Sequence, residues 1–165
     1  MTMARREAER GCAEAQTALG MWCQQGGEGL VQDNVEAAAW FHRAVGRGLP
    51  AAQYLLAKCY YRGQSMGQSD TLAAKWGRKA ADQGDPPAQV FVGAVYASGV
   101  AGVKKDLPLG ERYLELSAAQ GSEDSVKLLM ALRKCVACGK LDVHHMICSR
   151  CYNRRYCDAT CQLQH

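Results

Sequence analysis

Six of the nine cysteines in this chain are gathered into three close pairs near its C-terminus. The pairs are Cys135 and Cys138, Cys148 and Cys151, and Cys157 and Cys161. Two thiolates separated by two or three residues can direct both sulfurs at one Zn²⁺, and each structural zinc ion takes about four ligands in a tetrahedron. Three pairs therefore predict more than one zinc ion. Because a site closed by four sulfurs leaves no open position for water or substrate, we expect a structural role for the metal.

Disulfides or buried free thiols are the alternatives to zinc for such a cluster. Disulfides belong to oxidising compartments, and the chain begins Met-Thr-Met-Ala-Arg-Arg-Glu, which lacks the apolar core of a signal peptide. The sequence therefore favours reduced thiols that bind zinc, and a cytoplasmic or nuclear location.

The last cysteine pair separates two classes of zinc finger. Cys157 and Cys161 have three residues between them, as on one turn of a helix, where a RING finger would normally have two. With the dipeptides Tyr156-Cys157 and Cys161-Gln162 and the two earlier pairs, this spacing resembles a MYND zinc finger. The resemblance covers residues 135–165.

The resemblance to MYND fingers implies two zinc sites. The first and third pairs would share one ion, with Cys135, Cys138, Cys157 and Cys161 as its ligands. The second pair, Cys148 and Cys151, would begin the other site, which the family completes with a His and a Cys further downstream. His165 stands just before the Trp that the family shows after Cys-Gln, so we expect the sequence to be cut short. His144, His145 or His165 are alternative ligands, although adjacent histidines are also typical of a solvated loop between zinc knuckles.

Composition limits the remaining possibilities. A chain of 165 residues with 48% hydrophobic content can build one substantial core and a small satellite, or a continuous solenoid core. No run approaches the roughly 18 apolar residues of a transmembrane helix, so we expect no membrane partner. The net charge of +4 comes from basic residues interleaved with acids, which gives little indication of nucleic-acid binding.

The residues before the cysteine pairs repeat with a period of 36 or 37. Each unit has an Ala-Gln dipeptide, a Gly ten positions after the Gln, an Asp seven positions after that Gly, and an aromatic residue beyond it. The glutamines are Gln16, Gln53 and Gln89, the glycines Gly26, Gly63 and Gly99, the aspartates Asp33, Asp70 and Asp106, and the aromatic residues Trp40, Trp76 and Tyr113. This pattern predicts a stack of similar units, each of which buries its neighbour's apolar face.

Each unit has the periodicity of two helices. The three glycines stand where a residue in the left-handed conformation ends a first helix, and the three aspartates are placed to cap the second helix. We expect the aromatic positions to lie in the core between repeats. Cys23 and Cys59 lie on the apolar stripe of first helices, which predicts that they are core residues.

Residues 13–121 resemble Sel1-like repeats, the glycine-rich relatives of tetratricopeptide repeats. The resemblance implies an all-α helical-repeat solenoid. Residues 4–10 resemble the second helix of an earlier unit, and residues 122–134 a half repeat that caps the stack. We therefore predict two domains, with Sel1-like repeats at 1–134 and an incomplete MYND finger at 135–165.

The function implied by both resemblances is protein interaction. Sel1-like repeats resemble adaptor surfaces, and MYND fingers resemble docking sites for short proline-rich peptides. The sequence offers no nucleophile with a base and an orienting acid, and no glycine-rich phosphate loop after a strand, so we expect no enzyme activity. The leading interpretation is a zinc-binding adaptor or scaffold with protein partners.

Two other classes of function remain open. MYND fingers also occur beside methyltransferase domains, and a RING finger would indicate a ubiquitin ligase, so the chain could be a regulatory or targeting fragment of a larger enzyme. Arg150, Arg154 and Arg155 lie near Tyr152 and Tyr156, an arrangement that could stack on and neutralise a nucleic-acid strand. The alternative for these residues is that Tyr156 packs under the zinc site and the arginines form a solvated rim.

Overall fold

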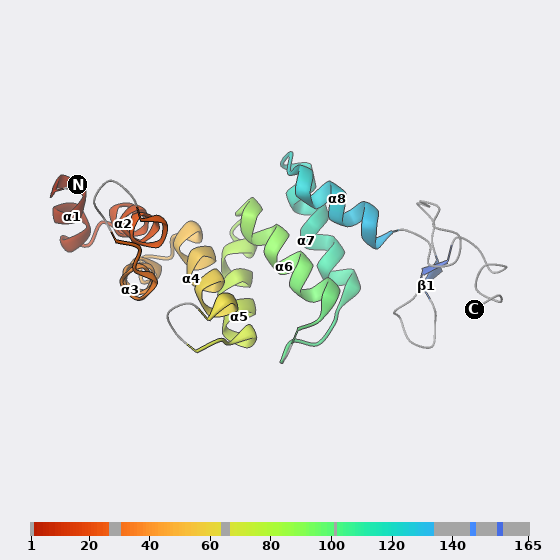
Figure 1. The fold of residues 1–165 in the computed structure, drawn as a ribbon. Helices are drawn as coiled ribbons and strands as arrows, with labels where there is room; N and C mark the ends of the chain where they lie inside the picture. The colour runs from red at the N-terminus through yellow and green to blue at the C-terminus, as the bar shows by residue number, and fades with distance from the viewer. Residues whose placement is uncertain are drawn as a thin grey trace.

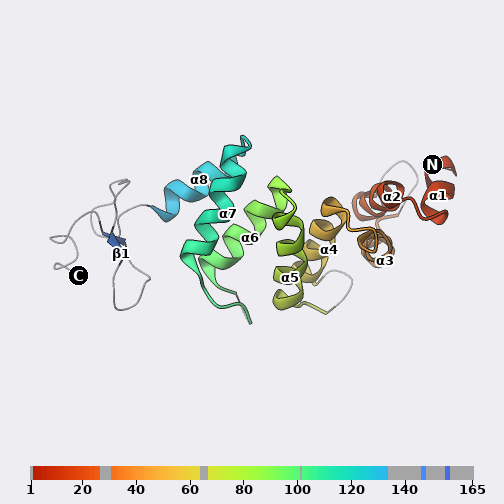
Figure 2. The same ribbon diagram turned by 180° about the vertical axis from the view of Figure 1, so that it is seen from behind.

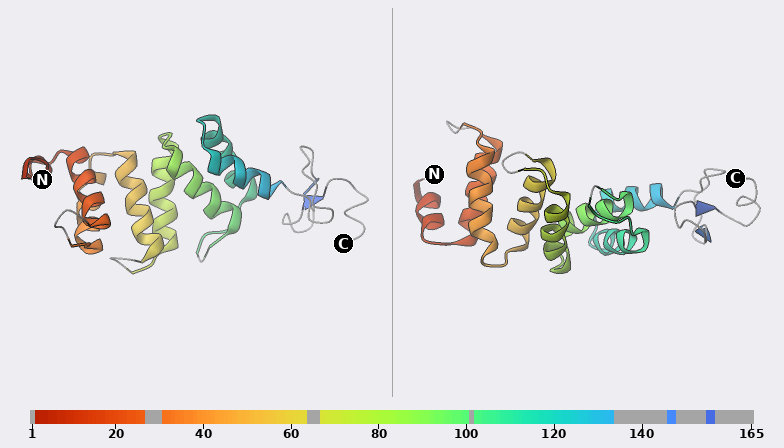
Figure 3. Two further views of the ribbon diagram at one scale, coloured as in Figure 1. Left: turned by 45° about the horizontal axis from the view of Figure 1, so that its top comes forward. Right: turned by 90° about the horizontal axis from the view of Figure 1, so that it is seen from below.

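The structure is a computed structural model that describes residues 2–26, 31–63, 67–100, 102–133, 146–147 and 155–156. These residues form eight α-helices and, at 146–147 and 155–156, two short strands. The helices are α1 (Thr2–Glu9), α2 (Ala13–Gln25), α3 (Asn34–Val45), α4 (Pro50–Arg62), α5 (Asp70–Asp82), α6 (Pro86–Ser98), α7 (Leu107–Ala119) and α8 (Glu123–Leu132). They stack in chain order as an elongated row with α1 and α8 at opposite ends (Figure 1). The same order is seen from behind (Figure 2) and from two further directions (Figure 3).

The row consists of helical hairpins. Helices α2, α4 and α6 are the first helices of three units, and each packs against the second helix of its unit, α3, α5 or α7. A half unit stands at each end, because α1 packs on α2 and α8 packs on α7. The all-α helical-repeat fold predicted from the sequence is therefore confirmed.

The loop inside each hairpin is closed by the same backbone hydrogen bond. The residue that caps the second helix donates its N–H to the carbonyl of the residue three positions before the loop glycine. These bonds join Asp33 to Cys23 (2.8 Å), Ser69 to Tyr60 (3.0 Å) and Asp106 to Tyr96 (2.9 Å). All three glycines have positive φ, but only Gly63 (φ 63°, ψ 22°) is left-handed helical, whereas Gly26 and Gly99 have ψ of −176° and 126°. The predicted left-handed cap is thus wrong at two of the three positions.

The predicted helix caps are right in two repeats and wrong in one. The carboxylates of Asp33 and Asp106 accept hydrogen bonds from the first turns of α3 and α7. In the middle repeat the hydroxyl of Ser69 is the cap, and Asp70 is the first helical residue. The physical reason is that this loop is one residue shorter, so the residue seven positions before Trp76 is Ser69.

The glutamine of each Ala-Gln dipeptide is buried and joins helices through its side-chain amide. The Nε2 atoms of Gln16 and Gln89 donate to the carbonyls of Ala8 and Ala81 in the preceding helix, at 2.9 and 3.3 Å. The Oε1 atoms of Gln53 and Gln89 accept from glutamines at the ends of the second helices, Gln83 at 2.8 Å and Gln120 at 2.9 Å.

The first repeat lacks this second bond. The Oε1 atom of Gln16 is buried and has no hydrogen-bond partner among the described residues. Arg47 stands at the position of Gln83 and Gln120, directly before Gly48 as they stand before Gly84 and Gly121, and its N–H donates to Ala44 as theirs donate to Ala80 and Ser117. The acceptor of Gln16 is left over because no glutamine occupies this position in the first repeat.

Small residues let the helices approach closely. An added Cβ at Gly110 of α7 would lie 2.8 Å from the carbonyl oxygen of Gly93 and 2.9 Å from the backbone nitrogen of Ala97, both in α6. Since real Cβ contacts essentially never fall below 3.0 Å, α6 and α7 could not pack as they do with any larger residue there. The fully buried large side chains between the helices include Phe41, Leu56, Val92 and Leu114.

The remaining predicted core positions agree with the structure. Trp40 and Tyr113 are buried and Trp76 is half-buried. Cys23 and Cys59 are buried in the core cluster that they share with Phe41. Burial, followed by the charges of nearby carboxylates, raises the pKa of Cys23, so this thiol stays protonated and behaves as an apolar residue.

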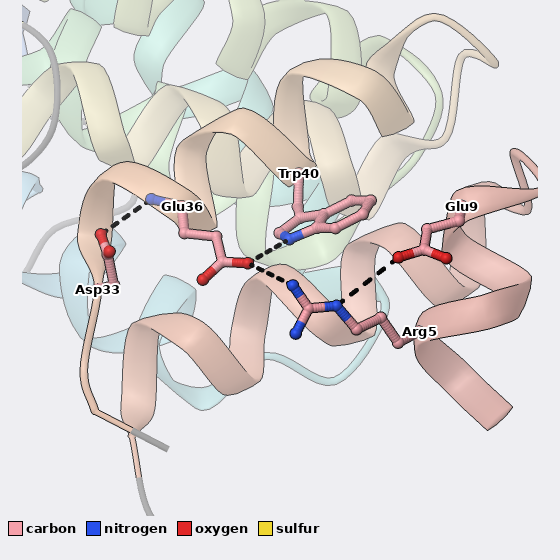
Figure 4. Close-up of polar contacts among 5 residues, drawn as sticks. All are labelled: Arg5, Glu9, Asp33, Glu36 and Trp40. Carbon is pink, nitrogen blue, oxygen red and sulfur yellow. Dashed lines mark hydrogen bonds and ion pairs between the residues drawn. The ribbon is translucent and has the colours of Figure 1, made fainter. Parts of the chain in front are cut away.

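A polar network holds the N-terminal half unit against the first repeat (Figure 4). Asp33 caps α3 through the N–H of Glu36 (2.9 Å), and the Glu36 carboxylate accepts from Nε1 of Trp40 (3.3 Å). Arg5 of α1 pairs with the same carboxylate (3.6 Å) and with Glu9 (3.7 Å). These groups are largely exposed, so the ion pairs add little to stability and mainly orient α1.

The two strands lie within the predicted finger. β1 (Met146–Ile147) pairs with β2 (Arg155–Tyr156) in antiparallel fashion, with Met146 opposite Tyr156 and Ile147 opposite Arg155. In the described residues before 134, the strand-like pairing is a single bridge between Val100 and Val103. None of the described helices is long and apolar enough to cross a membrane.

Candidate functional site

A groove of about 1200 Å³ runs between α5 and the segment that connects α6 to α7. Its lining residues come from α5, from the last turn of α6, from the connecting loop and from the start of α7. The charged members are Lys75, Arg78, Lys79, Asp82, Lys104, Lys105 and Asp106. Five cations against two carboxylates make this groove basic.

The first wall of the groove is one face of α5. Thr71, Lys75, Arg78 and Asp82 are spaced by three or four residues, so their side chains lie in one row along the helix. The opposite face of α5 carries buried alanines, for example Ala80, which pack into the stack. The row of charged side chains is therefore left facing the groove.

The second wall is the loop between α6 and α7, which forms a pointed arm in Figure 1. The arm turns back on itself where the N–H of Val103 donates to the carbonyl of Val100 at 2.8 Å. Gly102, in this turn, has a φ of 81°, and an added Cβ there would lie 2.7 Å from Cγ2 of Thr71. The glycine thus lets the arm lie directly against the start of α5, and Lys104 follows on the same wall.

Both carboxylates in the groove are already held by this chain. Asp106 accepts from the N–H of Leu109 (3.0 Å) as the cap of α7. Asp82 accepts from the hydroxyl of Tyr113 (2.5 Å) and pairs with Nε of Arg78 (3.7 Å). These contacts hold both carboxylates in place within the groove.

The hydroxyl of Tyr113 is fixed as the donor in this contact. Burial, the hydrogen bond to Asp82 and the charge of that carboxylate raise the pKa of Tyr113, so the phenol keeps its proton. Tyr113, Tyr96 and Asp82 together raise the pKa of Arg78, which is thus a permanent cation in the groove.

Two lysines stand on opposite walls without a partner among the described residues. Lys75 on α5 and Lys104 on the arm are both exposed, and no hydrogen bond or ion pair joins either of them to this part of the chain. Lys79, in contrast, lies over the ring of Trp76 at 4.5 Å. Lys75 and Lys104 are the cations that an incoming anion could pair with at least cost.

The positive charges of α5 recur only in part in the other repeats. Lys79 on Trp76 repeats the contact of Arg43 on Trp40 (4.6 Å), whereas the third repeat has Leu116 at that position. At the positions equivalent to Lys75 and Arg78, the first repeat has Ala39 and His42, and the third has Arg112 and Glu115. Stacking of the repeats therefore does not require a cation at either position.

Ammonium and guanidinium groups arranged in this way form charge-assisted hydrogen bonds with carboxylates or phosphates. The same groove also exposes apolar surface from Val103 and Pro108. Its chemistry is that of a binding surface for a ligand with both acidic and apolar groups.

The predicted zinc ligands, Cys135, Cys138, Cys148, Cys151, Cys157 and Cys161, lie outside the described residues. His144, His145 and His165, the alternative ligands, lie outside them too, and of the Arg-Tyr cluster only the backbone pairing of Arg155 and Tyr156 is described. Within the described residues no group of three or more potential ligands comes together. The zinc sites thus remain a prediction.

The basic groove was not predicted from the sequence. Its signal is the run of cations at Lys75, Arg78 and Lys79, which becomes visible when each position is compared with its equivalents in the other repeats. Lys104 has no such signal in the sequence, because it lines the groove only through the contact of the arm with α5.

The fold places the protein among the solenoids built from two-helix repeats. Residues 13–49, 50–85 and 86–122 match the Sel1 repeat, so the chain belongs to the Sel1 repeat family, as its sequence predicts. A comparison with curated proteins finds no match. Sel1 repeats suggest a protein-interaction scaffold.

Two solved structures illustrate the similarity. A Sel1 repeat protein from Oxalobacter formigenes is 35% identical with a TM-score of 0.69, over 79% of this chain and 96% of that one. A protective antigen of uropathogenic Escherichia coli strains that displays an SLR fold is also 35% identical, with a TM-score of 0.71, over 75% of this chain. The match spans only 26% of that antigen's length.

Proposed function

We propose that this protein is a zinc-dependent interaction scaffold without enzyme activity, located in the cytoplasm or nucleus. The observation that carries the proposal is the stack of three Sel1 repeats over residues 13–122, with the six-cysteine segment close behind it. The repeats offer an extended surface to protein partners, and the segment at 135–165 forms a MYND-type finger that docks short proline-rich peptides.

The donor set supports zinc as the metal. Thiolates are soft ligands that select zinc over magnesium or calcium, and closely spaced pairs are typical of structural zinc sites. Cys135, Cys138, Cys157 and Cys161 would hold one ion, and Cys148 and Cys151 would contribute to a second. When bound, zinc supplies folding free energy to a segment that is too short to bury an adequate core.

Native mass spectrometry of the 165-residue chain tests the metal. We expect one zinc ion bound tightly and a second bound weakly or not at all, because only the first site has four clear ligands. Cys138→Ser or Cys157→Ser should release the tight ion, whereas the control Cys59→Ser, a change in the solenoid core, should retain it. Two tight ions, with the second lost on changing His144, His145 or His165 to Ala, would show that the ligand assignment is wrong.

Peptide binding tests the finger. A labelled Pro-x-Leu-x-Pro peptide should bind, and binding should disappear after zinc chelation and for a peptide whose prolines are replaced by Ala. Because proline fixes the backbone and the contacts are mainly apolar, affinity should depend little on salt. Failure of the peptide to bind, with single-stranded nucleic acid bound and a steep salt dependence, would favour the nucleic-acid function instead.

A further inference from the structure

We propose that the basic groove between α5 and the α6–α7 arm is a docking site for an extended acidic segment of a protein partner. The proposal rests on the scaffold function and specifies one surface and one ligand chemistry for it. The main contacts would be from Lys75 and Arg78 on one wall and Lys104 on the other.

The dimensions of the groove fit a short extended peptide. From Thr71 to Asp82 the lining face of α5 rises by about 16 Å at about 1.5 Å per residue. At about 3.3 Å per residue, an extended chain of about five residues covers that length. The groove volume of about 1200 Å³ is larger than a single inorganic anion needs.

The charges fit carboxylates that are separated by other side chains. Lys75 and Lys104 have no partner among the described residues, so they lose no existing contact when a carboxylate arrives. Arg78 is a permanent cation that contacts Asp82, Tyr96 and Tyr113, and it adds positive charge to the wall on which Lys75 lies. A peptide that alternates acidic with apolar residues would place the apolar ones on Val103 and Pro108.

A nucleic acid fits the groove less well. Its backbone carries a negative charge at every nucleotide, and the carboxylates of Asp82 and Asp106 line the same surface. Those two groups are held by Tyr113 and by the first turn of α7, so they cannot turn away. A uniform polyanion would meet this repulsion, whereas a peptide can place a neutral residue next to each carboxylate.

The test is a fluorescence anisotropy titration of the full chain with a labelled peptide in which Glu alternates with Leu over about seven residues. The same peptide with Gln in place of Glu is the ligand control. We expect the Glu peptide to bind at least tenfold more tightly than the Gln peptide, and to weaken as salt screens the charges.

The variant Lys75→Glu/Lys104→Glu should weaken binding of the Glu peptide at least tenfold. Its matched control is Arg6→Glu/Lys127→Glu, which makes the same change in net charge at exposed positions on α1 and α8 and should stay within twofold of the parent chain. Circular dichroism of both variants confirms folding, since all four side chains are exposed. Equal affinity of the two variants would overturn the proposal.

Two further measurements separate this site from the other possibilities. The first is a competition with an oligothymidylate of about ten nucleotides. If it displaces the Glu peptide and has the higher affinity, the proposal is overturned in favour of nucleic acid. Repeating the titration with EDTA distinguishes the groove from the finger. Binding of the Glu peptide should survive chelation, because α5 and the arm fold without metal. If EDTA abolishes only the binding of the proline-rich peptide, the groove proposal is unaffected.

Discussion

Replacing Arg47 by Gln should stabilise the protein. Arg47 stands directly before Gly48, as Gln83 and Gln120 stand directly before Gly84 and Gly121. Its backbone N–H donates to the carbonyl of Ala44, as that of Gln83 donates to Ala80, so the two residues occupy the same position in their repeats. A glutamine at position 47 can therefore donate to the buried Oε1 of Gln16, as Gln83 donates to Gln53 one repeat later.

The expected gain comes from one hydrogen bond. A bond to a buried acceptor contributes about 1 kcal/mol. The side chain of Arg47 is exposed, so its removal should cost little. A gain of about 1 kcal/mol corresponds to a rise in Tm of about 3 °C for a chain of this size.

Thermal and urea unfolding of three variants measures this gain. Arg47→Ala removes the arginine without adding a donor and should differ from the parent chain by less than about 0.5 kcal/mol. The third variant, Gln16→Met, removes the acceptor, and in that background Arg47→Gln should gain no more than Arg47→Ala. Because Gln16→Met removes the bond to Ala8 from both arms of the comparison, the double-mutant cycle isolates the amide pair. If Arg47→Gln is no more stable than Arg47→Ala in the parent chain, the inferred role of the glutamine is wrong.

Three other predictions follow from the packing. Gly110→Ala should destabilise the protein by about 2 kcal/mol in urea unfolding, because the added methyl meets backbone atoms of α6; a loss of less than about 0.5 kcal/mol would mean that the helices separate easily. The raised pKa of Tyr113 contributes stability that is complete below its unfolded pKa of about 10 and is lost as pH rises through the folded value, so the unfolding free energy should fall in alkali. Tyr113→Phe should lower the unfolding free energy at neutral pH and reduce its loss in alkali. The loss that remains should come from Tyr54, because burial raises the pKa of Tyr54 too. An unchanged pH profile would contradict the contact of Tyr113 with Asp82. Far-ultraviolet circular dichroism of the full chain should be dominated by helix and persist after EDTA is added, and a spectrum dominated by strand would contradict the repeat fold.

The sequence predicted the repeat fold because its period constrains many residues at once. Leu19, Leu56 and Val92 recur at the same position of successive first helices, so one stacking arrangement buries them all. The predicted cap at Asp70 is wrong because the distance from the loop glycine to the cap is one residue shorter in the middle repeat. The distance from the cap to the packed aromatic residue is the same in all three repeats, and from Trp76 it identifies Ser69.

The groove could not be predicted in the same way. Lys75 and Lys104 are not part of the repeat signature, and they line the same groove because Gly102 lets the arm lie against Thr71. That contact depends on the distance between two neighbouring hairpins, which the period of the sequence does not specify. The cysteine pairs carry a strong local pattern, and their zinc sites stay a prediction until the metal is measured.

The unpaired Oε1 of Gln16 also bears on the order in which the stack opens. In the second and third repeats a glutamine bond closes each hairpin at its open end, whereas the first repeat lacks it and has a largely exposed ion-pair network around Arg5. Local opening in a repeat protein begins where the interfaces are weakest. Native-state hydrogen exchange should therefore be fastest in α1 to α3 and slowest around α6 and α7. A partner that binds the N-terminal end would then contact helices that often unfold locally. The groove, in contrast, lies in the slowest-exchanging part of the stack.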